Sequence, residues 1–407
     1  MRRQKGPESV EESLKSASTL DVAAAPAKAG PLAAWTKSYT LEGLSSGRTN
    51  NFTLLRFVAA SLVIISHSYA TAWGNNADPV LKYFGSLETG GTLGVLVFFS
   101  ISGYLITQSF AARAHLKTFL IARVLRIYPG LIAATFYSAL LASFATTVPL
   151  SKFLTDDMTQ TFLLHNSLGY PTMYYLPGAF AKNPYVGAVN GSLWTLPIEM
   201  EMYVLVAVLG IVGYIAHRVW FNIFFTGLVV FAWVYKPAES LLIYGDTPNV
   251  GRMAMIFLFG IFFYVNRDRI PINIPSAALL VAAIAVFHKV PGIRMLYLPA
   301  VAYIVLVLAY HPKLYFPAFN RLGDYSYGLY IYAFPTQQLI AYHIKGIRPV
   351  PLFLLAYPCI LAMAILSWKF IEKPMLKLKP RASASRDTLS HGRDLHANEP
   401  PLPAASS

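Results

Sequence analysis

Three ionisable side chains lie within or at the edge of long apolar segments. Arg56 and His67 belong to the segment 52–73, and Glu199 follows Pro197 at the start of another apolar run. Charged groups inside a bilayer are costly and are functional candidates by default. A carboxylate at such a depth needs a partner, and an imidazole, which titrates near neutral pH, is a suitable one. These residue types therefore predict an acid–base pair within a membrane.

The spacing of Arg56 and His67 predicts that both side chains project from one helix face. They are eleven residues apart, which at ~100° per residue is within ~20° of three full turns and separates them by ~16 Å along the axis. Arg56 then lies near the cytoplasmic end, and His67 about two thirds of the way across. Two alternatives remain open. Arg56 could snorkel to the interface, and His67 could serve only to hydrogen-bond a neighbouring helix.

Glu199 is expected about one turn into its helix, at a depth similar to that of His67. Pro197 suits the first helical turn, and Glu199 shares a helix face with Tyr203 at the i,i+4 spacing. We therefore expect Glu199 to pair with the imidazole of His67. The alternative is that the carboxylate only stabilises the start of the helix.

A basic cluster follows the second apolar segment and consists of Arg113, Lys117, Arg123 and Arg126. Arg123 and Arg126 are three residues apart on a short helix that is predicted before Pro129, so their guanidinium groups share a face. Such a pair is suited to binding phosphate through charge-assisted hydrogen bonds. The alternative is a positively charged anchor on the cytoplasmic side of a membrane.

The composition indicates that these residues are positioned by membrane helices. Of the 407 residues, 55% are hydrophobic and only 13% are charged, against roughly a quarter charged in soluble domains. The mean hydropathy is +0.48. Because ~20 apolar residues cross a bilayer core, we predict an all-α, polytopic integral membrane protein with about ten transmembrane helices. The predicted helices lie near 52–73, 91–110, 127–148, 197–216, 219–236, 251–265, 274–289, 294–310, 325–343 and 350–370.

The distribution of charge predicts the orientation of the chain and argues against a nucleic-acid partner. The net charge is +14, and the Lys and Arg residues lie mostly in tails and short loops, as the positive-inside rule describes. Both termini are therefore expected in the cytoplasm, with the long loop 149–196 on the outer side. The Asn, Gly, Pro and Tyr residues of this loop suit polar or sugar contacts, and they suit an ordinary ordered loop equally well.

The predicted domain organisation is a membrane domain, 50–375, between two disordered cytoplasmic tails, 1–49 and 376–407. The tails are rich in small and charged residues, and the first lacks the apolar core of a cleavable signal peptide. Cys359 is the only cysteine, which excludes a disulfide within the chain. The sequence has no His or Cys spacing that predicts a metal site.

Six short motifs occur in a characteristic order. They are Arg56-x10-His67, Gly94-Val-Leu-Val-Phe-Phe-Ser-Ile-Ser-Gly-Tyr-Leu-Ile106, Arg123-Val-Leu-Arg126-Ile-Tyr-Pro129, Ser192-Leu-Trp-Thr-Leu-Pro-Ile-Glu199 with Tyr203, Ser326-Tyr-Gly-Leu-Tyr-Ile-Tyr332, and Glu372-Lys-Pro374. Over about 50–375 the chain thereby resembles the acyltransferase-3 family of bacterial membrane O-acyltransferases. Many members have a His after the late Ser-Tyr block, where this chain has Ala333, so the role of that His is not transferred. The small residues of the second motif are expected to allow close helix packing.

The resemblance implies a membrane O-acyltransferase with no permanently bound cofactor. Its donor would be cytoplasmic acyl-CoA, most commonly acetyl-CoA. Its acceptor would be a glycan or lipid-linked oligosaccharide at the outer side of the bacterial inner membrane. His67 would act as a general base or would itself be acylated, and Arg56 and Glu199 would complete the catalytic group. The CoA phosphates would be bound by Arg123, Arg126, Arg113 and Lys117, and the substrate would be contacted by Trp194, Tyr203, Tyr327 and Tyr330.

Two other functional classes remain open from the sequence. A transporter or flippase of lipid-linked glycans would also place Arg, His and Glu within the membrane, but it would move its substrate without consuming acyl-CoA. A polyprenyl-phosphate glycosyltransferase would normally have paired acidic metal ligands. Asp156-Asp157 is the only adjacent Asp pair, and a solvated loop explains it better.

Overall fold

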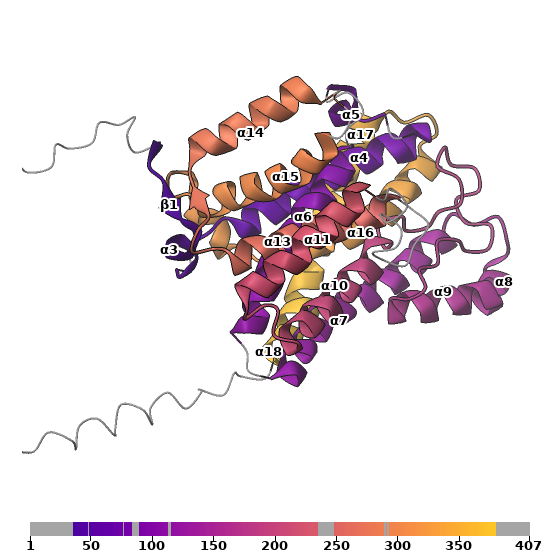
Figure 1. Ribbon diagram of the computed structural model, residues 1–407. Helices are drawn as coiled ribbons and strands as arrows, with labels where there is room; N and C mark the ends of the chain where they lie inside the picture. The colour runs from indigo at the N-terminus through magenta and orange to yellow at the C-terminus, as the bar shows by residue number, and fades with distance from the viewer. Residues whose placement is uncertain are drawn as a thin grey trace, which may run out of the picture.

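The computed structural model describes residues 36–47, 49–75, 77–83, 89–112, 115–234, 248–288, 290 and 293–379, which are mostly helical. The long helices lie side by side in a bundle (Figure 1). Each of the ten predicted apolar segments coincides with one helix. These helices are α4 (Phe52–Trp73), α6 (Gly90–Ala111), α7 (Leu116–Ser143), α10 (Thr195–Ile211), α11 (Arg218–Val234), α13 (Pro248–Val265), α14 (Ile274–Phe287), α15 (Ile293–Tyr310), α16 (Ser326–His343) and α17 (Pro349–Ser367).

In the described part of the chain, four helical stretches are long and apolar enough to cross a membrane. They are α4, α6, α7 and the stretch Pro349–Lys377, while α11, α13, α14 and α15 contain shorter apolar helices. A mostly helical chain with such stretches is what a multi-pass membrane protein requires, because a helix satisfies its own backbone hydrogen bonds in lipid. The number of ten spans, the cytoplasmic termini and the domain boundaries stay predictions.

The remaining elements are short and connect or flank the bundle. They are β1 (Tyr39–Thr40), α3 (Leu41–Ser45), α5 (Pro79–Tyr83), α8 (Leu150–Thr155), α9 (Asp157–Leu168), β2 (Pro271–Ile272), the 3-10 helices η1 (Pro312–Leu314) and η2 (Pro317–Arg321), the π-helix η3 (Trp368–Glu372) and α18 (Lys373–Lys377). In Figure 1, α8 and α9 lie together beyond one end of the bundle.

Part of the predicted N-terminal tail is packed against the bundle. Tyr39 of β1 pairs antiparallel with Ile272 of β2, and Leu41 of α3 is fully buried. One buried apolar side chain and a strand pairing therefore attach 36–47 to the bundle, and the assignment of 1–49 to a disordered tail stays a prediction. Of the two predicted tails, residues 1–35, 48 and 380–407 lie outside the described residues, whereas 376–377 belong to α18.

Helix α7 begins earlier than the sequence predicts. We expected a short basic helix and then a separate span from residue 127, but Leu116–Ser143 is one helix that contains Pro129. Pro129 therefore does not end the helix. Close to it, the hydroxyl of Tyr327 on α16 donates to the carbonyl oxygen of Ile127, at 2.8 Å. As a result, the basic residues and the apolar span belong to a single helix.

Glycine residues bring α6 and α13 into close contact. A Cβ atom on Gly103 would lie 2.1 Å from the carbonyl oxygen of Phe257, and one on Gly260 would lie 2.6 Å from that of Ser100. Neither site tolerates a side chain without movement of the backbone. The expectation that small residues of the second motif serve close helix packing is confirmed for Gly103.

The segment 189–193, directly before α10, contains buried side chains and packs among the helices of the bundle. Asn190 is fully buried, and its amide donates to the hydroxyl of Ser138 on α7 and to the carbonyl oxygen of Ile331 on α16. Non-helical backbone inside a membrane protein is tolerated where it is buried among protein groups that satisfy its hydrogen bonds. Helix α10 therefore follows a segment that is fixed between α7 and α16.

Candidate active site

A cavity of about 250 Å³ lies among α4, α6, α7, α10 and α16, and we call it the inner cavity. Three arginine residues line it: Arg56, Arg123 and Arg126. Glu199 and Tyr203 of α10 line it as well. Residues that the sequence assigned to catalysis, to phosphate binding and to substrate binding are thus found around one space.

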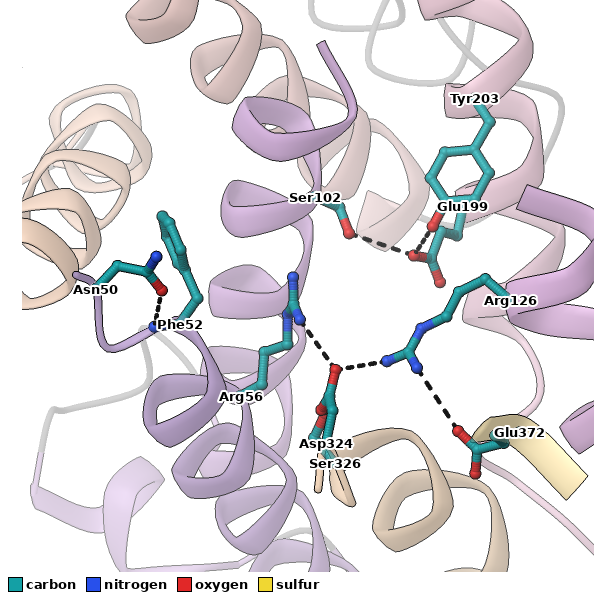
Figure 2. Close-up of polar contacts among 10 residues, drawn as sticks. All are labelled: Asn50, Phe52, Arg56, Ser102, Arg126, Glu199, Tyr203, Asp324, Ser326 and Glu372. Carbon is teal, nitrogen blue, oxygen red and sulfur yellow. Dashed lines mark hydrogen bonds and ion pairs between the residues drawn. The ribbon is translucent and has the colours of Figure 1, made fainter. Parts of the chain in front are cut away.

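Two of these arginine residues share one carboxylate. One oxygen of Asp324, Oδ2, accepts hydrogen bonds from Arg56 at 3.0 Å and from Arg126 at 2.6 Å, as Figure 2 shows. Arg126 also lies 3.7 Å from Glu372, whose side chain is 1% exposed. The hydroxyl of Ser326 donates to the other oxygen of Asp324, at 2.6 Å. Asp324 therefore connects α4 and α7 at the start of α16.

The charge of Asp324 is stabilised by its neighbours. Burial disfavours the ionised carboxyl, but the guanidinium groups of Arg126 and Arg56 outweigh this effect and lower the pKa of Asp324 to about 2. The carboxylate is consequently ionised throughout the physiological pH range, and it orients both guanidinium groups beside the inner cavity.

The predicted phosphate-binding cluster is only partly assembled. Arg123 and Arg126 both line the inner cavity, and Arg123 lies over the rings of Phe119 and Tyr203, 5.6 and 5.7 Å from their centroids. Lys117 is exposed in the first turn of α7 and does not line this cavity. Arg113 lies outside the described residues.

Glu199 does not pair with His67. Its Oε1 accepts hydrogen bonds from the hydroxyl of Tyr203 and, at 3.3 Å, from that of Ser102 (Figure 2). The predicted sharing of a face by Glu199 and Tyr203 is confirmed, and the predicted imidazole partner is wrong. Helix α10 instead places Glu199 in the wall of the inner cavity beside the three arginine residues, and His67 does not line that cavity.

His67 lines a second space of about 430 Å³, which we call the outer cavity. Its ring makes an edge contact with Phe334 at 5.2 Å, and its Nδ1 has no hydrogen-bond partner among the described residues. Trp194 lines the outer cavity too. Aromatic side chains form much of the remaining wall: Tyr174, Tyr175, Tyr185 and Tyr330. The imidazole is therefore available to a bound molecule.

The inner and outer cavities adjoin each other. Val95 and Tyr330 line both of them, and the hydroxyl of Tyr330 is hydrogen-bonded to that of Thr195, at 2.8 Å. Tyr327 lines only the inner cavity. Of the four residues predicted to contact substrate, Tyr203 and Tyr327 thus belong to the inner cavity, Trp194 to the outer cavity, and Tyr330 to both.

Sequence reasoning missed three polar residues of the site: Ser102, Asp324 and Glu372. Ser102 was assigned to helix packing, but it donates to Glu199. Glu372 was quoted only as part of a late motif, although it is a carboxylate within an apolar stretch, the same signal that identified Glu199. Asp324 precedes the Ser326 motif by two residues, and nothing in the local sequence indicates that two distant arginine residues converge on it.

The arrangement provides the parts of a group-transfer site. One cavity presents guanidinium groups, which suit phosphate. The adjoining cavity presents an imidazole with a nitrogen that has no partner among the described residues, which suits proton abstraction or nucleophilic attack. The aromatic wall around the imidazole suits a ring-shaped organic ligand.

Comparison with known proteins identifies the family. Residues 49–369 match the acyltransferase-3 family model, which is described as an acyltransferase domain. An O-acetyl transferase of Shigella phage Sf6 is 27% identical over 337 residues, covering 81% of this chain and 96% of the phage protein. Nodulation protein 10 of Rhizobium leguminosarum bv. viciae is 28% identical over 387 residues, covering 84% of this chain and 97% of that protein.

A more distant relative is a putative O-acetyltransferase of Staphylococcus aureus, 22% identical over 330 residues, covering 71% of this chain and 53% of the relative. No solved structure matches the chain significantly. The family model covers most of the chain and includes both cavities. The chain therefore belongs to the acyltransferase-3 family and is a membrane acyltransferase.

Proposed function

We propose that this enzyme transfers an acyl group, in the first instance acetyl, from cytoplasmic acyl-CoA to a hydroxyl group of a surface or exported glycan. The observation that carries the proposal is the pair of adjoining cavities, one lined by arginine residues and the other by His67. One relative is named an O-acetyl transferase and another a putative O-acetyltransferase, and these names support acetyl as the transferred group. All three relatives come from bacteria or a phage of bacteria, which supports a location in the bacterial cytoplasmic membrane.

The inner cavity is proposed to receive the donor. Arg123 and Arg126 bind the CoA phosphates by charge-assisted hydrogen bonds, and Arg113 and Lys117 stay additional candidates from the sequence. Arg56 lies along the route of the pantetheine arm toward His67. Glu199 acts in the inner cavity and not at the imidazole. It accepts a hydrogen bond from the hydroxyl of Tyr203 and thereby orients the ring over which Arg123 lies.

The outer cavity is proposed to receive the acceptor, with Trp194 and its tyrosine neighbours packing against the sugar ring. His67 removes the proton of the acceptor hydroxyl, the oxygen attacks the thioester carbonyl, the C–S bond breaks, and the proton passes to the CoA thiolate. In the two-step alternative the imidazole itself attacks the thioester, and the hydroxyl then takes the acyl group from nitrogen. Both routes have the same balance: thioester and alcohol give ester and thiol.

The test is transfer of label from acetyl-CoA in membranes that contain the His67→Ala variant. We expect a loss of at least 100-fold, which is the usual contribution of a general base. The matched control is His343→Ala, because His343 is exposed at the end of α16 and lines neither cavity. Full transfer by a normally abundant His67→Ala variant would remove His67 from the chemistry.

The same assay separates the enzyme from the transporter alternative. A flippase would move a lipid-linked glycan without releasing CoA. If membranes with abundant wild-type protein and a complete set of cell glycans released no CoA thiol above the level of empty membranes, the proposed function would be wrong.

A further inference from the structure

Two side chains form the wall between the inner and outer cavities. Val95 of α6 and Tyr330 of α16 are the only lining residues common to both cavities in the described part of the chain. Both are nearly inaccessible, with 5% and 6% of their surfaces exposed. Any group that passes from one cavity to the other therefore passes these two side chains.

Tyr330 is held at both ends of its side chain. Its hydroxyl is hydrogen-bonded to Thr195 at 2.8 Å, and its ring makes an edge contact with Phe98, with 5.9 Å between centroids. Val95 has no polar atom in its side chain and offers only two methyl groups. The wall thus combines a tyrosine that is fixed in place with a small apolar side chain.

We propose that Val95 and Tyr330 select a short, uncharged acyl group for transfer. This inference rests on the proposed function, in which the donor phosphates lie at the inner cavity and the acceptor hydroxyl at the outer one. The acyl carbon must then be at or near the shared wall when it is transferred, so each added methylene group has to fit against Val95 and the ring of Tyr330.

The chemistry of the wall also argues against charged acyl groups. The one polar atom that Val95 and Tyr330 offer is the tyrosine hydroxyl, which already bonds Thr195. A terminal carboxylate, as in a succinyl group, would lose its hydration beside the side chains of Val95 and Phe98. Acetyl satisfies both conditions, since it is small and uncharged.

The experiment compares transfer from labelled acetyl-CoA and butyryl-CoA in membranes and reports the butyryl-to-acetyl ratio. Val95→Ala enlarges the wall and is expected to raise this ratio at least about tenfold, since one methylene group in a tight pocket changes selectivity by that factor or more. The matched control is Val63→Ala, because Val63 is equally buried but lines only the outer cavity. The butyryl-to-acetyl ratio of the Val63→Ala variant should stay at the wild-type value.

A second variant protects the test against a folding failure. Tyr330→Phe keeps the ring and removes the bond to Thr195, so the ring can move and the ratio should again rise. If Val95→Ala does not accumulate in membranes, Tyr330→Phe decides the question alone.

The outcomes distinguish the inference from the proposed function. If the wild-type enzyme transfers acetyl but Val95→Ala and Tyr330→Phe keep the wild-type ratio, the selectivity inference is wrong and the proposed function stands. An equal rise for Val63→Ala would also overturn the inference, because selectivity would then belong to the whole outer cavity. If the wild-type enzyme releases no CoA from either donor, the proposed function fails, and the inference fails with it.

Discussion

At the scale of single residues, the arginine side chains around the inner cavity have different surroundings. Arg126 is engaged by two carboxylates, those of Asp324 and Glu372, whereas Arg123 lies over aromatic rings. A buried ion pair that loses one partner leaves an uncompensated charge. Removing Arg126 would therefore disturb the fold as well as the ligand site, and Arg123 is the cleaner probe of donor binding.

We predict that Arg123→Ala raises the KM for acetyl-CoA by about tenfold, with a smaller effect on kcat. The physical reason is the loss of one charge-assisted hydrogen bond to a phosphate, about 1.5–3 kcal/mol. The measurement is initial-rate transfer in membranes over a range of acetyl-CoA concentrations. Arg321→Ala is the control, since Arg321 is an exposed residue of η2 that lines neither cavity. An unchanged KM in Arg123→Ala would refute the phosphate role.

At the scale of elements, one ionic network joins segments that are far apart in the sequence. Arg56 of α4, Arg126 of α7, Asp324 before α16 and Glu372 of the π-helix η3 are connected in series (Figure 2). The ring of Trp368, also in η3, lies 5.8 Å from the guanidinium carbon of Arg126. The network therefore stabilises the position of the C-terminal helical stretch against the walls of the inner cavity.

We predict that Asp324→Asn destabilises the protein by about 3–5 kcal/mol, the cost of breaking a buried ion pair. Unfolding of the detergent-solubilised protein by SDS would measure this change. Asp157→Asn is the control, since Asp157 is exposed in the first turn of α9. If both variants lowered the free energy of unfolding by the same small amount, the structural role of Asp324 would be contradicted.

The pH dependence of this contribution follows from the direction of the pKa shift. The folded-state pKa of Asp324 is lowered to about 2, below the value of about 3.9 for an unfolded chain. The stabilisation is therefore fully present above about pH 4, and it is lost as the pH falls toward 2. The difference in the free energy of unfolding between wild type and Asp324→Asn should accordingly decrease as the pH is lowered from about 4 toward 2.

At the scale of the whole molecule, the two cavities lie in line along α4. Arg56, in the second turn of α4, lines the inner cavity, and His67, in its last third, lines the outer cavity. If the N-terminus is cytoplasmic, as the distribution of basic residues predicts, the inner cavity is nearer the cytoplasm and the outer cavity is nearer the opposite side. This orientation is what a cytoplasmic donor and an exported acceptor require.

We predict that a membrane-impermeant maleimide labels Asp157→Cys, but not Arg321→Cys, on intact cells. Both substitutions are made in a Cys359→Ala background, because Cys359 is the only native cysteine. Both positions are exposed in the structure, so accessibility to water does not separate them. Labelling of both after the cells are broken is the control, and the reverse pattern on intact cells would invert the proposed topology.

The sequence alone determined the class of the protein and singled out several of the residues that line the two cavities. Apolar length and charge distribution are local properties of the chain, so they predicted helices at all ten positions and identified Arg56, His67, Arg123, Arg126 and Glu199 as unusual. Motif order then indicated the family that the comparisons establish.

Only the tertiary structure decided which of these residues meet. The segment around Asn190 that precedes α10 is held between α7 and α16, and in the packed bundle Glu199 contacts Ser102 and Tyr203 instead of His67. The convergence of Arg56 and Arg126 on Asp324 joins residues that are 268 and 198 positions from it in the chain. Helical periodicity fixes the face of a residue on its own helix, whereas the depth of a helix and the choice of its partners depend on packing between distant segments.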